Sequence, residues 1–265
     1  MAVERQSNNS GAMPVLFVGH GNPMNAIEDG DFSRAWTHEG SLLPRPLAIL
    51  CISAHWESDG TFVGATAKPE MIYDFYGFPD ELFKVIYPSP GAPDWADRVR
   101  KTVTGTKVKA DPERGLDHGA WVILHRMFPK ADIPVFQMSL DRRKRPQEHY
   151  DLGRQLMPLR ENGLLIICSG NMVHNLALMT WSDSAFSWAT DFDRELARLI
   201  EKRDHKALIN YPALGESARK AIPTNEHYLP MLYALSLQRK DESLRFFADR
   251  VTLGSMSMRS FRIGS

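Results

Sequence analysis

Four short apolar segments, each followed by polar or turn-forming residues, limit what this chain can fold into. They are rich in aliphatic residues and lack the polar alternation of a half-exposed strand, which is typical of strands buried on both faces. The segments are 14–18, 47–52, 133–140 and 164–168. Four such strands predict a sheet that is covered by helices on both faces.

Helical patterns lie between these segments, with apolar residues three or four positions apart and charges on the other side. The predicted helices are 94–103, 147–159, 191–203 and 230–237. Residues 246–263 have a β-rich pattern, and no internal repeat or long linker divides the chain. We therefore expect a flexible N-terminus over 1–12 and a single α/β domain over 13–265, with a mostly parallel or mixed sheet.

Composition excludes several classes of protein. The 265 residues include 32 basic and 32 acidic side chains, so no net positive charge favours nucleic acid or an anionic membrane. Cys51 and Cys168 lie inside apolar segments, which argues against a disulfide scaffold. No apolar run reaches the ~20 residues that a membrane helix needs. We expect a cytoplasmic protein without nucleic-acid or membrane partners, while the oligomeric state stays open.

Four of the nine histidines have ordinary surroundings. His38, His149 and His205 lie among charged residues, which predicts solvated surface positions. His125 lies four residues before Pro129 in an apolar stretch and is expected to be an ordinary helix residue. None of these four is a candidate ligand.

The other five histidines lie at strand ends or in turn-rich loops: His20, His55, His118, His174 and His227. Because ligands bind beyond the carboxyl ends of strands in open α/β sheets, imidazoles from different strand ends can converge on one site. Imidazole is the commonest side-chain metal ligand. The sequence lacks HExxH, CxxC, GxSxG, GxGxxG and P-loop motifs. These observations predict a mononuclear metal site that is assembled from distant loops.

The motifs GHGNPMNA, ISAHWES, GLDHGAW, SGNMVHNL and PTNEHYLP, together with IYDFYGFP at 72–79, occur in one order along nearly the whole chain. In this set the chain resembles the class III extradiol dioxygenases of the LigB-like superfamily, in their DOPA 4,5-dioxygenase branch. The resemblance implies a non-haem metal centre that binds a small catecholic, DOPA-like substrate and O2. It also implies cleavage of the ring next to the diol, giving a muconic semialdehyde type of product.

The resemblance also implies roles for individual residues. His20 and His55 would be metal ligands, His174 the acid/base residue, and His118 a second imidazole that hydrogen-bonds substrate or oxygen. The third ligand is His227 in this branch, whereas general class III chemistry would favour its neighbour Glu226. Adjacent residues of an extended segment point opposite ways, so only one of the two can face the metal.

The ring-opening reaction with O2 also indicates which metal ion the histidines hold. Iron(II) is expected for turnover, because it is redox-active and holds open positions. Zinc(II) is expected as an alternative occupant of the resting or purified protein, where His174 would complete a tetrahedral shell.

Three further side chains are expected near the substrate. Tyr76 would stack on a flat ring. Asn175 would contact substrate or orient the neighbouring His174, or else satisfy a turn. Asp117 would orient the neighbouring His118, or else satisfy a turn.

Two other functions use the same histidines. One is a zinc-dependent hydrolase that polarises water; the other is a metal-binding protein without turnover. Oxygen consumption would separate a dioxygenase from both.

Overall fold

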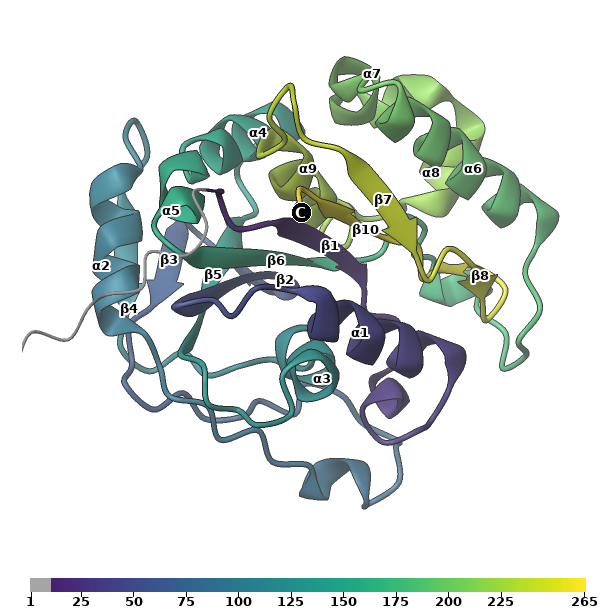
Figure 1. Cartoon of the computed structure of the whole chain (residues 1–265). Helices are drawn as coiled ribbons and strands as arrows, with labels where there is room; N and C mark the ends of the chain where they lie inside the picture. Colours follow the sequence, from purple (N-terminus) through teal and green to yellow (C-terminus); the bar gives the residue numbers. More distant parts are fainter. Residues whose placement is uncertain (1–10) are drawn as a thin grey trace, which may run out of the picture.

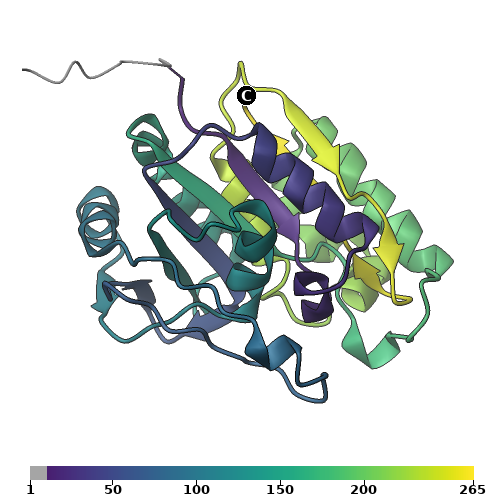
Figure 2. The ribbon, with the colours of Figure 1, turned by 60° about the horizontal axis from the view of Figure 1, so that its bottom comes forward.

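A mixed eight-stranded sheet forms the centre of the fold in a computed structural model, which describes residues 11–265 (Figure 1). The strand order is β4-β3-β5-β2-β6-β1-β10-β7. The strands of this sheet are β1 (Val15–Gly19), β2 (Ala48–Ser58), β3 (Thr61–Gly64), β4 (Val108–Asp111), β5 (Val135–Asp141), β6 (Leu164–Gly170), β7 (Leu244–Phe247) and β10 (Ser260–Ile263). Strands β5, β2, β6 and β1 are parallel. At the edge, β10 is antiparallel to β1, and β7 is antiparallel to β10, so β7 runs in the same direction as β1 (Figure 2). A separate two-stranded pair consists of β8 (Val251–Thr252) and β9 (Met256–Ser257).

Helices cover both faces of the sheet, as the sequence predicted. They are α1 (Asp31–Leu42), α2 (Pro93–Thr102), α3 (His118–Met127), α4 (Pro146–Arg154), α5 (Met157–Glu161), α6 (Ser187–Glu201), α7 (His205–Ile209), α8 (Glu216–Ala221) and α9 (Leu229–Ser236). Short 3-10 helices are η1 (Pro23–Ala26), η2 (Leu82–Lys84), η3 (Leu176–Leu178) and η4 (Tyr211–Leu214). Helices α1 and α3 pack on one face, while α4, α6 and α9 pack on the other (Figure 1).

Alternate residues of the central strands belong to two different cores. Val15 and Phe17 of β1 pack in the core beneath α4, α6 and α9, and Leu16 and Val18 pack in the core beneath α1 and α3. All four are completely buried. Successive side chains of a strand point to opposite faces, so a strand covered on both sides must be apolar at every position. The continuous apolar segments were therefore a reliable signal.

The four predicted strands are present, as is the β-rich C-terminal segment. The predicted helix 147–159 is divided into α4 and α5, because Pro158 lacks the N–H that would bond to the carbonyl of Arg154. Strand β2 continues to Ser58, beyond the predicted end at Ile52. Helix α1 and strands β3 and β4 were not predicted, because their apolar patterns are short or mixed with charge.

Two expectations concern the chain ends and membranes. Residues 1–10 of the expected flexible N-terminus lie outside the described residues, and Gly11 and Ala12 precede β1 without helix or strand. Within 11–265, none of the helices has the length and the apolar composition needed to cross a bilayer.

Candidate active site

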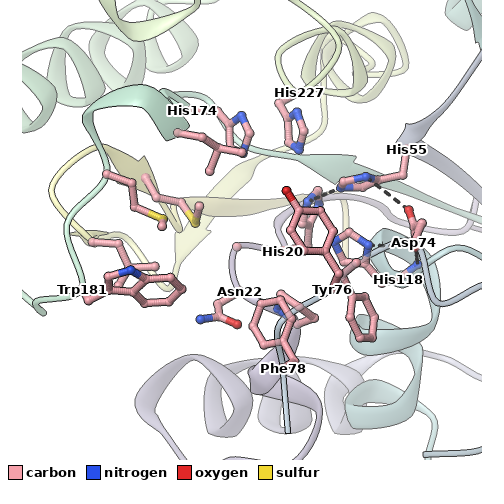
Figure 3. Close-up of a pocket in the computed structure, with 17 residues that line it drawn as sticks. His20, Asn22, His55, Asp74, Tyr76, Phe78, His118, His174, Trp181 and His227 are labelled. Atoms are coloured by element: carbon pink, nitrogen blue, oxygen red, sulfur yellow. Dashed lines mark hydrogen bonds and ion pairs between the residues drawn. The ribbon is translucent and has the colours of Figure 1, made fainter. Parts of the chain in front are cut away.

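Five imidazoles converge in one cavity beyond the carboxyl ends of the central strands (Figure 3). Their ring centroids are 4.9 Å apart for His20 and His55, and 3.9 Å apart for His55 and His118. His174 and His227 stack with centroids 3.5 Å apart and ring planes 10° apart. The five histidines selected from the sequence are therefore the five that the fold brings together.

The first two histidines come from neighbouring parts of the parallel sheet. His20 directly follows β1, and its backbone N–H donates to the carbonyl of Gly170 at 3.2 Å. His55 lies within β2 and not beyond its end, which corrects the expected strand boundary. The pairing of β2 with β5 shifts between Ile52 and Glu57, so the strand is irregular where His55 turns into the cavity.

The other three histidines come from loops and a helix start. His118 is the first residue of α3, with Asp117 as its N-cap. His174 follows β6, and its backbone N–H donates to the carbonyl of Ala221 at 2.9 Å. His227 lies two residues before α9.

A glycine at the end of β6 allows the His227 segment to approach the sheet. A Cβ atom at Gly170 would lie only 2.1 Å from the carbonyl oxygen of His227. That same carbonyl accepts a hydrogen bond from the backbone of Asn171 at 2.9 Å. Position 170 therefore requires glycine because of close backbone contact, not because of its own backbone angles.

A hydrogen-bond chain sets the tautomer of His20. The hydroxyl of Ser169 donates its single proton to the carbonyl of Gly119, so it accepts from Nδ1 of His20 at 2.9 Å. Nδ1 of His20 then carries the proton, and Nε2 presents a lone pair to the cavity. This is the arrangement that a metal-ligating histidine needs.

One carboxylate supports two imidazoles. Oδ1 of Asp74 accepts from Nδ1 of His118 at 2.9 Å, and Oδ2 lies 3.4 Å from Nδ1 of His55. Burial acts to raise the pKa of Asp74, but hydrogen bonds and charge from His118, and charge from His55, lower it to about 2. Asp74 is therefore an acceptor at neutral pH, and it does not occupy Nε2 of either ring.

Glu226 supports His227 in the same way. Its Oε1 accepts from Nδ1 of His227 at 3.0 Å and from the hydroxyl of Thr224 at 3.0 Å. His227 is buried, with 6% of its surface exposed. Because Glu226 pairs with Nδ1, Nε2 of His227 remains available to a ligand in the cavity.

His174 differs from the other four. Within residues 11–265, its ring has no hydrogen-bond partner; its contact is the stacking on His227. Burial lowers its pKa to about 4, with further lowering from His55 and His118. His174 is therefore neutral at pH 7 and has ring nitrogens available for proton transfer.

Burial also keeps His20, His55 and His227 neutral. It is the main cause that lowers the pKa of His55 to about 4 and the pKa values of His20 and His227 well below the ordinary value. Neighbouring imidazoles lower each of them further. Neutral imidazole is the form that binds a metal.

The donor set fits a metal ion. Nε2 of His20 and Nε2 of His55 are 3.0 Å apart, close to the about 3.3 Å that separates two nitrogen ligands of a tetrahedral ion. Ligand atoms lie within 4.8 Å of one another in two groups. The groups are His20, His55 and His118, and His174, Glu226 and His227.

The predicted substrate residues have different positions. Tyr76 lines the cavity of about 350 Å³ and is 92% exposed, so its ring stands at the opening. Asn175 does not line the cavity, because its amide donates to the carbonyl of Lys220 at 2.7 Å and holds that loop. Asp117 contacts Ser53, Arg114 and Gln137 rather than the ring of His118.

Asp74 was not selected as a site residue from the sequence. Its only signal was its place in the 72–79 motif, because it lies 44 residues before His118.

Two predictions for the remaining histidines are wrong. His149 is completely buried, because α4 packs on α9 and Nδ1 of His149 pairs with the hydroxyl of Tyr233 at 3.0 Å. His205 is half-buried and pairs with the hydroxyl of Tyr150 at 2.7 Å. His38 is exposed and His125 lies in α3, as expected.

Comparison with known proteins shows which family the chain resembles. Residues 19–255 match the family described as the catalytic LigB subunit of aromatic ring-opening dioxygenase. A protein of Escherichia coli strain K12 named 4,5-DOPA dioxygenase extradiol is 40% identical, over 97% of this chain and 96% of its own. A protein of the same name from Beta vulgaris is 36% identical, over 94% and 96%.

A solved structure has the same fold. The crystal structure of an uncharacterized protein from Escherichia coli K12 superposes with a TM-score of 0.84 at 38% identity. It covers 95% of this chain and 100% of its own.

Proposed function

Because the chain belongs to the LigB family of aromatic ring-opening dioxygenases, we propose that its five converging histidines hold one iron(II) ion and open the ring of a catechol. The protein is an extradiol, metal-dependent dioxygenase whose substrates are a small aromatic compound and O2. One observation carries the assignment of roles. Four imidazoles have Nδ1 beside a hydroxyl or carboxylate oxygen, while His174 has no such partner within residues 11–265.

His20, His55 and His227 are the proposed metal ligands. Each is neutral and has its Nδ1 beside a supporting oxygen, which directs Nε2 to the cavity. Glu226 then serves as the support of His227 and not as the third ligand. Bound iron(II) would supply a redox-active ion with open positions for substrate and O2, which zinc cannot do. In a resting zinc form, His174 would complete the shell.

His174 is the proposed acid/base residue. A catechol must lose a proton to bind through both oxygens, and a neutral imidazole can accept that proton and return it later. The ring of His174 is fixed by stacking on His227, yet its nitrogens have no hydrogen-bond partner in the part of the chain that the structure describes. This combination suits a group that must hold a proton during one part of the reaction and release it in another.

His118 is proposed to orient the substrate. Its Nδ1 proton goes to Asp74, so Nε2 is an acceptor that can receive a hydroxyl proton of the diol in a hydrogen bond. Tyr76 stands at the cavity opening, where its ring can cover one face of the catechol.

The zinc-dependent hydrolase is not favoured, because the matched family and the named relatives are dioxygenases. The test is anaerobic loading with iron(II), followed by a catechol and air, with oxygen uptake and visible absorbance recorded together. L-DOPA, catechol and protocatechuate are the first compounds to try, beside a zinc-loaded sample. We expect uptake and a new yellow chromophore in the iron sample alone; no uptake with any of the three would contradict the proposal.

A further inference from the structure

The cavity wall beyond the imidazoles is apolar. Figure 3 shows Trp181 on one side of the opening, with Tyr76 and Phe78 on the other. Leu176, Met179 and Met256 also line the cavity. A catechol whose diol faces the imidazoles must direct its ring substituent between these two walls.

This wall has no cationic partner for an acidic substituent. Among residues 11–265, no lysine or arginine lines the cavity. Asp74 is the carboxylate in the cavity lining, and Glu226 supports His227 beside it. Asp117 and Arg114 act on His55 from outside the lining, where they are paired with each other. A carboxylate on the substrate would therefore lose part of its hydration without gaining an opposite charge, which is unfavourable.

Asn22 is an uncharged hydrogen-bond donor in the cavity lining. Oδ1 of Asn22 accepts from the backbone N–H of Met24 at 2.9 Å, so the amide oxygen is already used. The amide NH2 is then the part of Asn22 left for a ligand, and in Figure 3 it lies on the side of Trp181. An amide N–H matches an uncharged acceptor such as an ester, ether or hydroxyl oxygen.

We infer that the cavity selects catechols whose ring substituent is uncharged and largely apolar, over catechols whose substituent carries a carboxylate. This inference rests on the proposed function and narrows its substrate class. Alkyl-substituted catechols and esters of catecholic acids belong to the preferred class. L-DOPA, whose substituent carries both a carboxylate and an ammonium group, is expected to be a weaker substrate than an uncharged catechol of similar size.

The test compares dihydrocaffeate with its methyl ester, since the two share one skeleton and differ in charge. With the iron-loaded protein, we expect kcat/KM for the ester to exceed that for the acid by about tenfold. Equal values, or a preference for the acid, would overturn the inference. If both compounds are opened but the acid is opened as well as or better than the ester, the proposed function stands and only this inference fails.

Binding provides a readout that does not need turnover. The dissociation constants of the same two compounds can be measured with zinc-loaded protein from quenching of tryptophan fluorescence, since Trp181 lines the cavity. Tighter binding of the ester supports the inference even if no catechol is opened, in which case only the proposed function fails. Equal or tighter binding of the acid contradicts the inference.

A matched pair of variants locates the selectivity. Leu176 lines the cavity and is 58% exposed, so Leu176→Lys adds a cation at the opening. We expect the ester-to-acid ratio to fall about two- to fivefold in this variant, and the fall to shrink at high salt. Leu178 lies on the same 3-10 helix outside the cavity lining, so Leu178→Lys should keep the original ratio. An equal fall in both variants would show that selectivity is not set by the cavity wall.

Discussion

The carboxylate of Asp74 holds His118 at two points, accepting from its ring Nδ1 at 2.9 Å and from its backbone N–H at 3.0 Å. The other carboxylate oxygen lies 3.4 Å from Nδ1 of His55. One side chain thus fixes the orientation of two imidazoles that belong to different elements, β2 and α3.

Replacing this carboxylate should weaken the metal site. In Asp74→Ala both imidazoles lose the acceptor that orients them, and loss of such a partner typically costs 10- to 100-fold in metal affinity. The measurement is metal affinity by competition with a chelator. Asp80→Ala is the matched control, because Asp80 is exposed and lies in the same loop segment. Unchanged affinity in Asp74→Ala would contradict the role given to this carboxylate.

The neighbours Glu226 and His227 should respond differently to substitution. His227→Ala removes a proposed ligand, so the purified protein should contain little metal. Glu226→Gln removes only the supporting charge and should retain metal with reduced affinity. Metal content can be measured by elemental analysis after dialysis. Loss of metal from the Glu226 variant alone would make Glu226 the ligand.

His174→Gln should separate metal binding from turnover. Its ring has no supporting partner in the described chain, so iron should remain bound when it is replaced. Loss of a general acid or base typically lowers the rate 10²- to 10⁴-fold. Steady-state oxygen uptake measures the rate, and iron content is measured on the same sample. A variant that keeps its rate would remove His174 from the reaction.

Gly170 should tolerate no side chain. In Gly170→Ala the new Cβ would lie 2.1 Å from the carbonyl oxygen of His227, so the His227 segment must move. We expect a loss of about 1–3 kcal/mol in the free energy of unfolding, together with weaker metal binding. Gly11→Ala is the control, because Gly11 is exposed and a Cβ at that position meets no atom of the described residues within 4 Å. Urea unfolding of both variants measures the difference.

Stability should fall at acidic pH partly because of His149. Burial, with a smaller effect of Lys144, lowers its pKa to about 4 in the folded protein, below the ~6.5 of an unfolded chain. The unfolded state therefore binds the proton more readily between these values. The contribution of neutral His149 to the free energy of unfolding is therefore complete above about pH 6.5. It is lost as the pH falls toward 4, and its size is about 3 kcal/mol.

The free energy of unfolding of His149→Gln should therefore decline less steeply between pH 6.5 and pH 4 than that of the original protein. The slope is compared rather than the absolute stability, because the substitution also changes packing against Tyr233. His38→Gln, at an exposed position, should keep the original slope. Equal slopes in all three proteins would mean that His149 does not titrate in this range.

The sequence by itself determined the central sheet and the five histidines. Continuous apolar segments indicate strands that are buried on both faces, and that requirement acts on each residue separately. The histidines at 20, 174 and 227 could also be selected from local sequence. Each lies in a short turn-rich stretch beside an apolar segment. The pair of Glu226 and His227 was also visible, since its members are adjacent.

Only the tertiary structure decided which carboxylate serves which imidazole. Asp117 is adjacent to His118, yet its oxygens are taken by Ser53, Arg114 and Gln137, and the distant Asp74 supports the ring instead. Packing of separate segments likewise buried His149 against Tyr233 within a charged stretch of sequence. A local pattern reports the burial of an element, but hydrogen bonds between distant segments depend on how those elements pack together.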